Sequence, residues 1–496
     1  MKRPVGLLLS LLVSAALCGV GLAQELTLAA AAQPETLDPQ VTAATSSFQS
    51  TKSLYDTLVE VAPDGEIVAA LAESWEVAED GSTVTFHLTD ATFHDGTSFD
   101  SADVKASIER IADPATGSPK ASEFATISEI ETPDENTVVL HLSEPTPALL
   151  ATLASGWGAM LPSEKVASGH DFGNMPVGTG PFVLDEWVRD SFLRLDRFED
   201  YYKGPVGLET VTIRFVPDSA VQLQGLITGE FDVIDTVASA DYGTVESNPD
   251  LELVREPSGL VLVGTINNRR EYLDDPQVRQ ALNYAVDKQV VLDVAYGGGE
   301  PVGTFMEVGS PWLPDSIGHF AYDPERAEEM LAEAGVPEEF TLDIVLPQPY
   351  PTHITAGQIV QDMLGDVGIE SEIRIVEWGV WLAEVYGGQH DFDITVIGHT
   401  GKLDPTGRLD GYGDPDNNYA GYDNEEVVEL LDRAASTSDV EERRELYAQV
   451  LTLMHEEAPF IYFGTPFRTY AARANVSGFW ITPLLDTFDF RDVRID

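Results

Sequence analysis

Two short stretches of this sequence carry residue types that could bind a phosphate or a metal ion. Gly178-Thr179-Gly180-Pro181 is similar to part of a nucleotide loop, but the proline removes a backbone amide and the third glycine of the pattern is missing. Asp414, Asp416 and Asn418 have the spacing of the first ligands of a calcium loop, yet Tyr419 stands where that loop needs glycine for its sharp turn. We therefore expect a turn at the first stretch and no metal site at the second.

Signatures of catalysis are missing from the sequence. It contains no Gly-x-Ser-x-Gly nucleophile elbow, no His-Glu-x-x-His and no Walker phosphate loop. Carboxylates are too abundant, with 84 Asp and Glu, for their proximity to argue for glycoside hydrolysis. We expect no catalytic residues, cofactor or metal. An enzyme with this sequence, such as an exported hydrolase, would need a water-activating residue beside an acid in a cleft.

The elements that must position any binding site alternate between strands and helices. Residues 83–88 and 137–142 alternate apolar and polar side chains, which predicts strands. Asp275-Pro276 and Asp323-Pro324 each combine an N-cap residue with proline at the first helical position, and apolar residues then recur at helical spacing. Residues 392–397 form a further apolar strand. Helices between strands imply crossover connections, so the fold class is mixed α/β.

The first residues indicate export. Lys2 and Arg3 precede an apolar run, and Gly21-Leu22-Ala23 offers the small residues that a signal peptidase reads before Gln24. Cys18 is the only cysteine, and Leu17 stands where a lipobox needs a small residue, so we expect no lipid anchor. We expect a periplasmic or cell-surface protein that is soluble after cleavage and is stabilised by its core without disulfides.

The balance of charges is strongly acidic, with a formal net charge of −56. Phosphate groups would be repelled, which excludes nucleic acid as a partner, and anionic membrane surfaces are disfavoured for the same reason. Acidic residues are spread along the whole chain instead of forming a tail. This pattern is typical of a solvated acidic surface suited to a salty exterior.

We predict that the melting temperature rises with NaCl concentration, because salt screens the repulsion between the many surface carboxylates. Thermal unfolding followed at low and at molar NaCl measures the effect. Equal melting temperatures under the two conditions would contradict the prediction.

One long stretch identifies a family. Residues 71–88, which read LAESWEVAEDGSTVTFHL, continue through Phe93-His-Asp-Gly-Thr97 to Ser101-Ala-Asp-Val104. With its fixed spacing, this pattern resembles the signature of the family 5 extracellular solute-binding proteins, which include the dipeptide- and oligopeptide-binding proteins of bacterial ABC importers. Four further segments match the family in order along the chain. They are residues 36–39, 54–58, 176–182 and 267–282.

The resemblance implies a clamp of two lobes of the periplasmic-binding-protein type, with mixed sheets flanked by helices and an extra inserted domain. Solute binds between the lobes, closure buries it, and the closed form docks on the membrane permease. We expect a monomer. The chain is expected to cross the hinge between about residues 264 and 268 and to return near 478. The expected divisions are a signal peptide (1–23), domain I (24–56, 174–264 and 479–496), domain II (57–173) and domain III (265–478).

The same resemblance points to the residues of the cleft. The segment 393–402 is similar to the main ligand-contact segment of the family, in which peptide binders carry an aspartate that pairs with the peptide ammonium. Lys402 stands at that position here, and a lysine would repel an ammonium by about 4 kcal/mol at ~4 Å and intermediate dielectric. Trp378 aligns with an aromatic residue of the pocket, whereas Trp381 is expected in the core. Trp157 and Phe488 are weaker candidates.

Two alternatives follow for the charged end of this segment. Either the solute is not a peptide with a free amine, or Asp404 supplies the carboxylate one register away. In the first case Lys402 and Arg408 could receive an acidic solute together. A peptide, an oligosaccharide or an acidic small molecule all remain open as the solute. The expected ligand-binding residues are Ala43, Thr45, Ser46, Trp378, Gly398, His399, Thr400, Lys402, Asp404 and Arg408, with Ala44 beside them.

Overall fold

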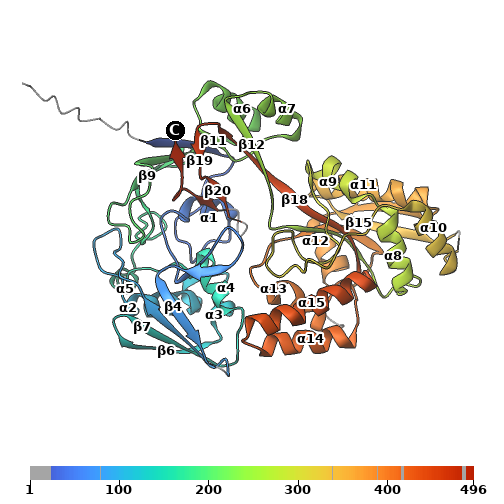
Figure 1. Ribbon diagram of the computed structural model, residues 1–496, viewed down its shortest axis with the longest axis horizontal. Coiled ribbons are helices and arrows are strands. Elements are labelled where there is room, and N and C mark those ends of the chain that lie inside the picture. The colour runs from blue at the N-terminus through green and yellow to red at the C-terminus, as the bar shows by residue number, and fades with distance from the viewer. Residues whose placement is uncertain (1–23, 79, 338, 388, 415–417, 483–486) are drawn as a thin grey trace, which may run out of the picture.

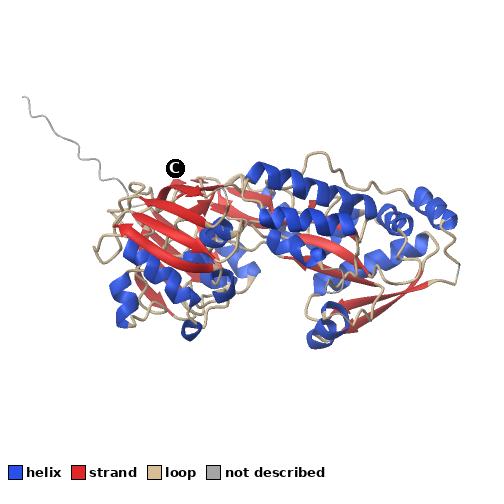
Figure 2. Ribbon diagram, turned by 90° about the horizontal axis from the view of Figure 1, so that it is seen from below, coloured by secondary structure: helices blue, strands red, loops and turns tan. Residues whose placement is uncertain are grey.

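The computed structural model describes residues 24–78, 80–337, 339–387, 389–414, 418–482 and 487–496. Two bodies lie side by side and are joined by long strands (Figure 1). In the view from below, helices flank the sheets of both bodies (Figure 2). The expected mixed α/β architecture of two lobes is confirmed.

One long strand, β18 (Phe460–Arg473), belongs to both bodies. Its first half pairs with β13 (Val261–Ile266), and its second half pairs with β12 (Leu251–Pro257). Because β12 and β13 follow each other in sequence, the chain passes between the bodies at 258–260 and again at 465–466 within β18. We define lobe 1 as residues 24–257 and 467–496, and lobe 2 as residues 261–464.

These two crossings lie earlier in the chain than we expected from the resemblance. β13 is already paired with β17 (Ile394–His399) inside lobe 2, and the second half of β18 has already returned to lobe 1. Antiparallel pairing along a shared strand gives two adjacent covalent connections, which is a geometry suited to a hinge. The division of the chain into three domains stays a prediction.

Lobe 1 is built around a mixed sheet. β1 (Glu25–Ala30) runs parallel to both β10 (Thr210–Phe215) and β11 (Val233–Ile234), and β10 continues antiparallel through β9 (Phe192–Arg197) to β8 (Phe182–Val188). β1 carries buried leucines and alanines, as expected of a strand covered on both faces.

A second sheet of lobe 1 contains the family signature. It has the order β4-β5-β7-β6, and α2 and α4 contribute to its hydrophobic core. Trp75 pairs with Phe86 across two of its strands. The signature is therefore structural. The elements are β4 (Ala72–Val77), β5 (Thr83–Leu88), β6 (Ile127–Asp134), β7 (Thr137–Leu142), α2 (Ser101–Ala112), α3 (Ala121–Phe124) and α4 (Leu149–Ala154).

The glycine-rich stretch that is similar to a nucleotide loop is a tight packing turn. A side chain on Gly178 would lie 2.1 Å from the Leu54 carbonyl oxygen, and one on Gly180 would collide with the same backbone. The buried imidazole of His94 spans the turn, because the Gly178 amide donates to Nδ1 and Nε2 lies 3.0 Å from the Gly180 carbonyl oxygen. Burial lowers the pKa of His94 to about 4, so the neutral ring holds this turn.

Lobe 2 consists of a sheet with helices on its flanks. β15 (Thr341–Pro347) runs parallel to β16 (Glu370–Val376) and to β17. β13 pairs antiparallel with β17 on one side and with β18 on the other, and these strands complete the sheet. Both predicted helix starts are confirmed, since Asp275 and Asp323 cap their helices with their side chains. The helices are α8 (Pro276–Ala285), α9 (Lys288–Tyr296), α10 (Pro324–Glu333), α11 (Pro351–Asp366), α12 (Trp378–Trp381), α13 (Thr406–Leu409), α14 (Glu425–Ser436) and α15 (Val440–Glu457).

Within the described ranges, no helix combines the length and the apolar character needed to cross a bilayer. The predicted signal peptide lies outside these ranges.

Candidate solute-binding cleft

The space between the lobes holds a cavity of about 550 Å³, which we call the main cleft. Lobe 1 contributes the start of α1 (Thr45–Thr51), α3 and α4, and lobe 2 contributes residues 400–407 after β17. Cavities of this size fit small-molecule ligands. The walls come from segments that are far apart in sequence and meet only because the two lobes face each other.

Two further cavities adjoin the main cleft. The inner pocket, about 540 Å³, lies within lobe 2 and shares Thr400, Lys402 and Gly407 with the main cleft. The hinge-side cavity, about 520 Å³, lies between the crossing strands and the loop 307–311, and it shares Gly401, Lys402 and Leu403 with the main cleft. Lys402 lines all three cavities.

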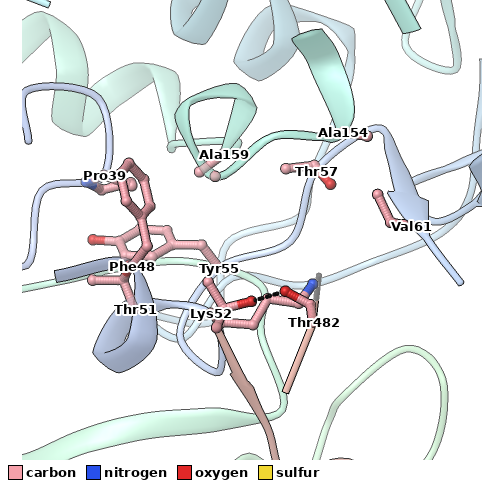
Figure 3. Close-up of a pocket in the computed structure, with 12 residues that line it drawn as sticks. Pro39, Phe48, Thr51, Lys52, Tyr55, Thr57, Val61, Ala154, Ala159 and Thr482 are labelled. Atoms are coloured by element: carbon pink, nitrogen blue, oxygen red, sulfur yellow. Dashed lines mark hydrogen bonds between the residues drawn. The ribbon is translucent and has the colours of Figure 1, made fainter. Parts of the chain in front are cut away.

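A smaller cavity of about 50 Å³ lies inside lobe 1, between Phe48, Lys52 and Tyr55 (Figure 3). It shares none of its lining residues with the three interconnected cavities. Its volume fits one or two water molecules and not a solute.

The structure brings most of the predicted residues together. Ala43, Thr45, Thr400, Lys402 and Asp404 line the main cleft. Trp157 also lines it, although its indole is mostly buried, stacks edge-on against Phe48 and donates to the Thr42 carbonyl oxygen. The residues of the inner pocket that were predicted are His399, Thr400, Lys402 and Arg408.

Other predicted residues line none of these cavities. Ser46 lies in the first turn of α1, where its carbonyl oxygen accepts from Ser50. The Ala44 carbonyl oxygen accepts from the amides that begin the same helix. Gly398 lies in β17 beside His353, and Phe488 is buried in the core of lobe 1.

Trp378 lies one layer away from the inner pocket. Its ring stacks on Trp381 with centroids 5.0 Å apart, and Trp381 stacks in turn on Tyr386, which lines the pocket. Trp381 is buried and donates to Thr395, as expected of a core residue. Tyr386 is therefore the aromatic residue of this stack that a solute can contact. It sits at the end of the π-helix Leu382–Tyr386, a local geometry that spacing rules for α-helices do not find.

The carboxylate of Asp404 is already hydrogen-bonded to other residues of lobe 2. Both of its oxygens accept from Arg443 at 2.8 Å, and the Thr406 amide donates to Oδ1. The side chains of Asp404 and Arg443 are 8% and 3% exposed, so the pair is isolated from water. A carboxylate with its lone pairs used in this way is a poor partner for a ligand ammonium.

Lys402 is the cation that faces the cleft without a carboxylate of its own among the described residues. Burial lowers its pKa, and the nearby Lys120 lowers the pKa further. Lys120 itself is paired with Glu123 on α3 and lies over the Trp157 ring. The cleft therefore presents an unneutralised positive charge on lobe 2 opposite a neutral pair on lobe 1.

The inner pocket ends in a polar cluster. His399 shares a hydrogen bond with the Tyr419 hydroxyl at 2.7 Å, and that hydroxyl also lies 2.6 Å from Thr265. Burial lowers the pKa of His399 to about 3, so the imidazole is neutral.

Tyr419, which stands where a calcium loop would need glycine, is a buried member of this cluster. Of the calcium-like residues, Asp416 lies outside the described ranges, and the side chain of Asn418 bridges turn carbonyls.

Arg408 lies beneath this pocket. Its Nη2 donates to Glu307 at 2.9 Å and to the Thr400 carbonyl oxygen at 3.1 Å. Its Nε and Nη1 are buried without a hydrogen-bond partner among the described residues. Glu307 was missed by sequence reasoning. The available signal was a carboxylate within the apolar run Phe305-Met306-Glu307-Val308.

Comparison with known proteins agrees with this geometry. The model of the bacterial extracellular solute-binding proteins, family 5 (middle), matches residues 66–420. The glutathione-binding protein GsiB of Escherichia coli K12 is 31% identical over 488 residues, which is 95% of each chain. Among solved structures, AgaA from A. tumefaciens R10 in complex with agropinic acid is 32% identical, with a TM-score of 0.70 over 95% of this chain and 99% of its own. HbpA2 from Haemophilus parasuis is 25% identical, with a TM-score of 0.85 over 95% of this chain and all of its own. The chain therefore belongs to family 5 of the bacterial extracellular solute-binding proteins, the solute-binding subunits of ABC importers.

Proposed function

We propose that this protein captures a small acidic peptide or peptide-like solute in the main cleft and delivers it unaltered to the membrane permease. The observation that carries the proposal is the position of Lys402. It lines all three connected cavities, and none of the described carboxylates is paired with it. A cation in a partly desolvated cleft favours an anionic group and disfavours an ammonium.

Charge accounting within the cleft supports an acidic solute. Among the described residues, the other charged side chains that line the main cleft are paired as Lys120–Glu123 and Asp404–Arg443, and Arg408 of the inner pocket is paired with Glu307. A solute with one net negative charge would neutralise Lys402 and leave no uncompensated charge in the main cleft. Glutathione, which has two carboxylates and one ammonium, has this net charge, and the relative GsiB is a glutathione-binding protein. The agropinic acid complex of AgaA is a second acidic precedent.

The rest of the proposal concerns how the protein works in the cell. The precursor is exported with residues 1–23 as signal peptide, and the mature chain acts as an unanchored monomer in the periplasm or at the cell surface. Closure of lobe 2 on lobe 1 around the two crossings at 258–260 and 465–466 buries the solute. The permease then binds the closed form. A hydrolytic role has no support among the described residues of the cleft, where no water-activating group converges with an acid.

Calorimetry with charge-matched solutes tests the proposal. We expect reduced glutathione to bind the wild-type protein, and we expect its dimethyl ester, which lacks both carboxylates, to bind at least tenfold more weakly. The neutral dipeptide Met-Leu serves as the peptide control. Native mass spectrometry of the freshly exported protein should show a trapped acidic solute that is recovered with its mass unchanged. Tighter binding of the neutral dipeptide, or conversion of the solute into a product, would refute the proposed function.

A further inference from the structure

A lysine–glutamate pair on lobe 1 faces Lys402 across the main cleft. Lys120, Glu123 and Lys402 all line this one cavity. Lys120 is paired with Glu123, and its Nζ lies 5.0 Å from the centroid of the Trp157 ring. Glu123 is thus a carboxylate that shares the main cleft with two lysines, one from each lobe.

Packing on both lobes fixes where these side chains begin. α3 is anchored by Phe124, which is buried in the hydrophobic core beneath the second sheet of lobe 1. On the opposite wall the stem of Lys402 lies beside Gly407, where an added Cβ would be 3.3 Å from Cδ of the lysine. The side chains of Lys120 and Glu123 are 23% and 45% exposed, so a solute in the cleft can reach both.

The charge of Glu123 acts on both lysines but neutralises only one of them. Burial and then Lys120 lower the pKa of Lys402, and Glu123 opposes them by raising it. Among the described residues, Glu123 is hydrogen-bonded to Lys120 and not to Lys402. An anionic group placed between the lobes would be attracted by both lysines and repelled by Glu123.

A solute carboxylate can replace Glu123 at Lys120. An exposed pair of residues three positions apart is weak, because water competes for both charges. Hydrogen bonds from two ammonium groups to one carboxylate in a partly desolvated cleft are stronger. The exchange leaves the two lysines, Glu123 and a solute of charge −1 with no net charge.

We propose that Glu123 is an internal competitor of the solute, which holds Lys120 in the empty cleft and is displaced when a solute carboxylate bridges Lys120 and Lys402. The inference rests on the proposed function and deepens it. Glu123 lowers the affinity for acidic solutes, because each must break the Lys120–Glu123 pair to bind. It also sets the charge selectivity, because its own negative charge repels solutes that carry more than one.

Removing the charge of Glu123 should therefore tighten the binding of an acidic solute. Reduced glutathione and its dimethyl ester are titrated by calorimetry into the wild-type protein, Glu123→Gln and Lys120→Met. We expect Glu123→Gln to bind glutathione about 3- to 10-fold more tightly than the wild type, and the ester no more tightly. We expect Lys120→Met to bind glutathione about 5- to 20-fold more weakly, although the new side chain can still pack on the Trp157 ring.

The double variant Lys120→Met/Glu123→Gln separates competition from simple repulsion. If Glu123 acts by holding Lys120, the gain from Glu123→Gln should fall below about twofold once Lys120 is replaced. Glu109→Gln is the matched control, because it removes the same charge from a lysine–glutamate pair of lobe 1, Lys105–Glu109 at 3.0 Å, that does not line the main cleft. It should leave both affinities within about twofold of the wild type.

Three results would overturn the inference while the proposed function stands. They are a Glu123→Gln protein that binds glutathione no more tightly than the wild type, an equal gain with and without Lys120, and an equal gain in Glu109→Gln. A wild-type protein that binds glutathione no better than its dimethyl ester would contradict the proposed function together with the inference.

Discussion

Asp404→Asn is expected to destabilise the protein by about 3–5 kcal/mol, the cost of leaving a buried charge without its partner. The destabilisation arises because Arg443 would keep its buried charge without a partner. Its side chain is 3% exposed, and its two hydrogen bonds at 2.8 Å both end on Asp404. Urea unfolding monitored by circular dichroism measures the change. The reciprocal variant Arg443→Met should be similarly destabilised, because it leaves Asp404 buried and unpaired.

The double variant Asp404→Leu/Arg443→Met provides the decisive control. Replacing both members of a buried pair by apolar side chains is often neutral, so the double variant should recover most of the stability lost by either single change. Asp432→Asn, on the exposed face of α14, should change stability by less than about 0.5 kcal/mol. A stable Asp404→Asn protein that had lost only its affinity for solute would show that Asp404 binds the ligand instead.

Regular elements could be read from the sequence because their determinants are local. Asp275 and Asp323 each cap a helix with a side chain two or three residues from the amide it accepts from, and proline follows immediately. The strand 83–88 buries Val84 and Phe86 on one face, as its alternation predicts. Gly335 follows the last turn of α10 with a φ of 72°, a left-handed conformation that glycine adopts without strain.

The cleft could be predicted only in outline, because its chemistry depends on pairings between distant segments. Family alignment found the strand that leads to Lys402. It could not show that Asp404 is neutralised by Arg443, 39 residues further along the chain. Glu307 lies in the long connection between β14 (Gly299–Glu300) and α10, where no periodicity constrains a side chain. Tyr386, the member of the aromatic stack that lines the inner pocket, lies in a π-helix, a geometry that α-helical spacing does not predict.

Lys402→Met is expected to weaken binding of an acidic solute by about 10- to 100-fold, since it removes the charge while keeping the length of the side chain. Lys402→Arg should retain most of the affinity. Lys105→Met, which removes an exposed lysine paired with Glu109 on α2, should leave affinity within about twofold of the wild type. Titration calorimetry with reduced glutathione measures all three variants. A Lys402→Met protein that bound glutathione as tightly as the wild type would remove Lys402 from the site.

Proton linkage gives the same prediction an independent readout. Burial and the neighbouring Lys120 lower the pKa of Lys402 in the free protein, and a bound carboxylate favours the charged form and raises that pKa again. Binding therefore takes up protons in the pH window between the lowered pKa of the free protein and the higher pKa of the complex, and affinity falls as the pH rises through that window. Calorimetry in buffers of different ionisation enthalpy detects this uptake. The uptake should become smaller in Lys402→Met and stay unchanged in Lys105→Met, because only the first of these lysines carries a proton that the solute stabilises.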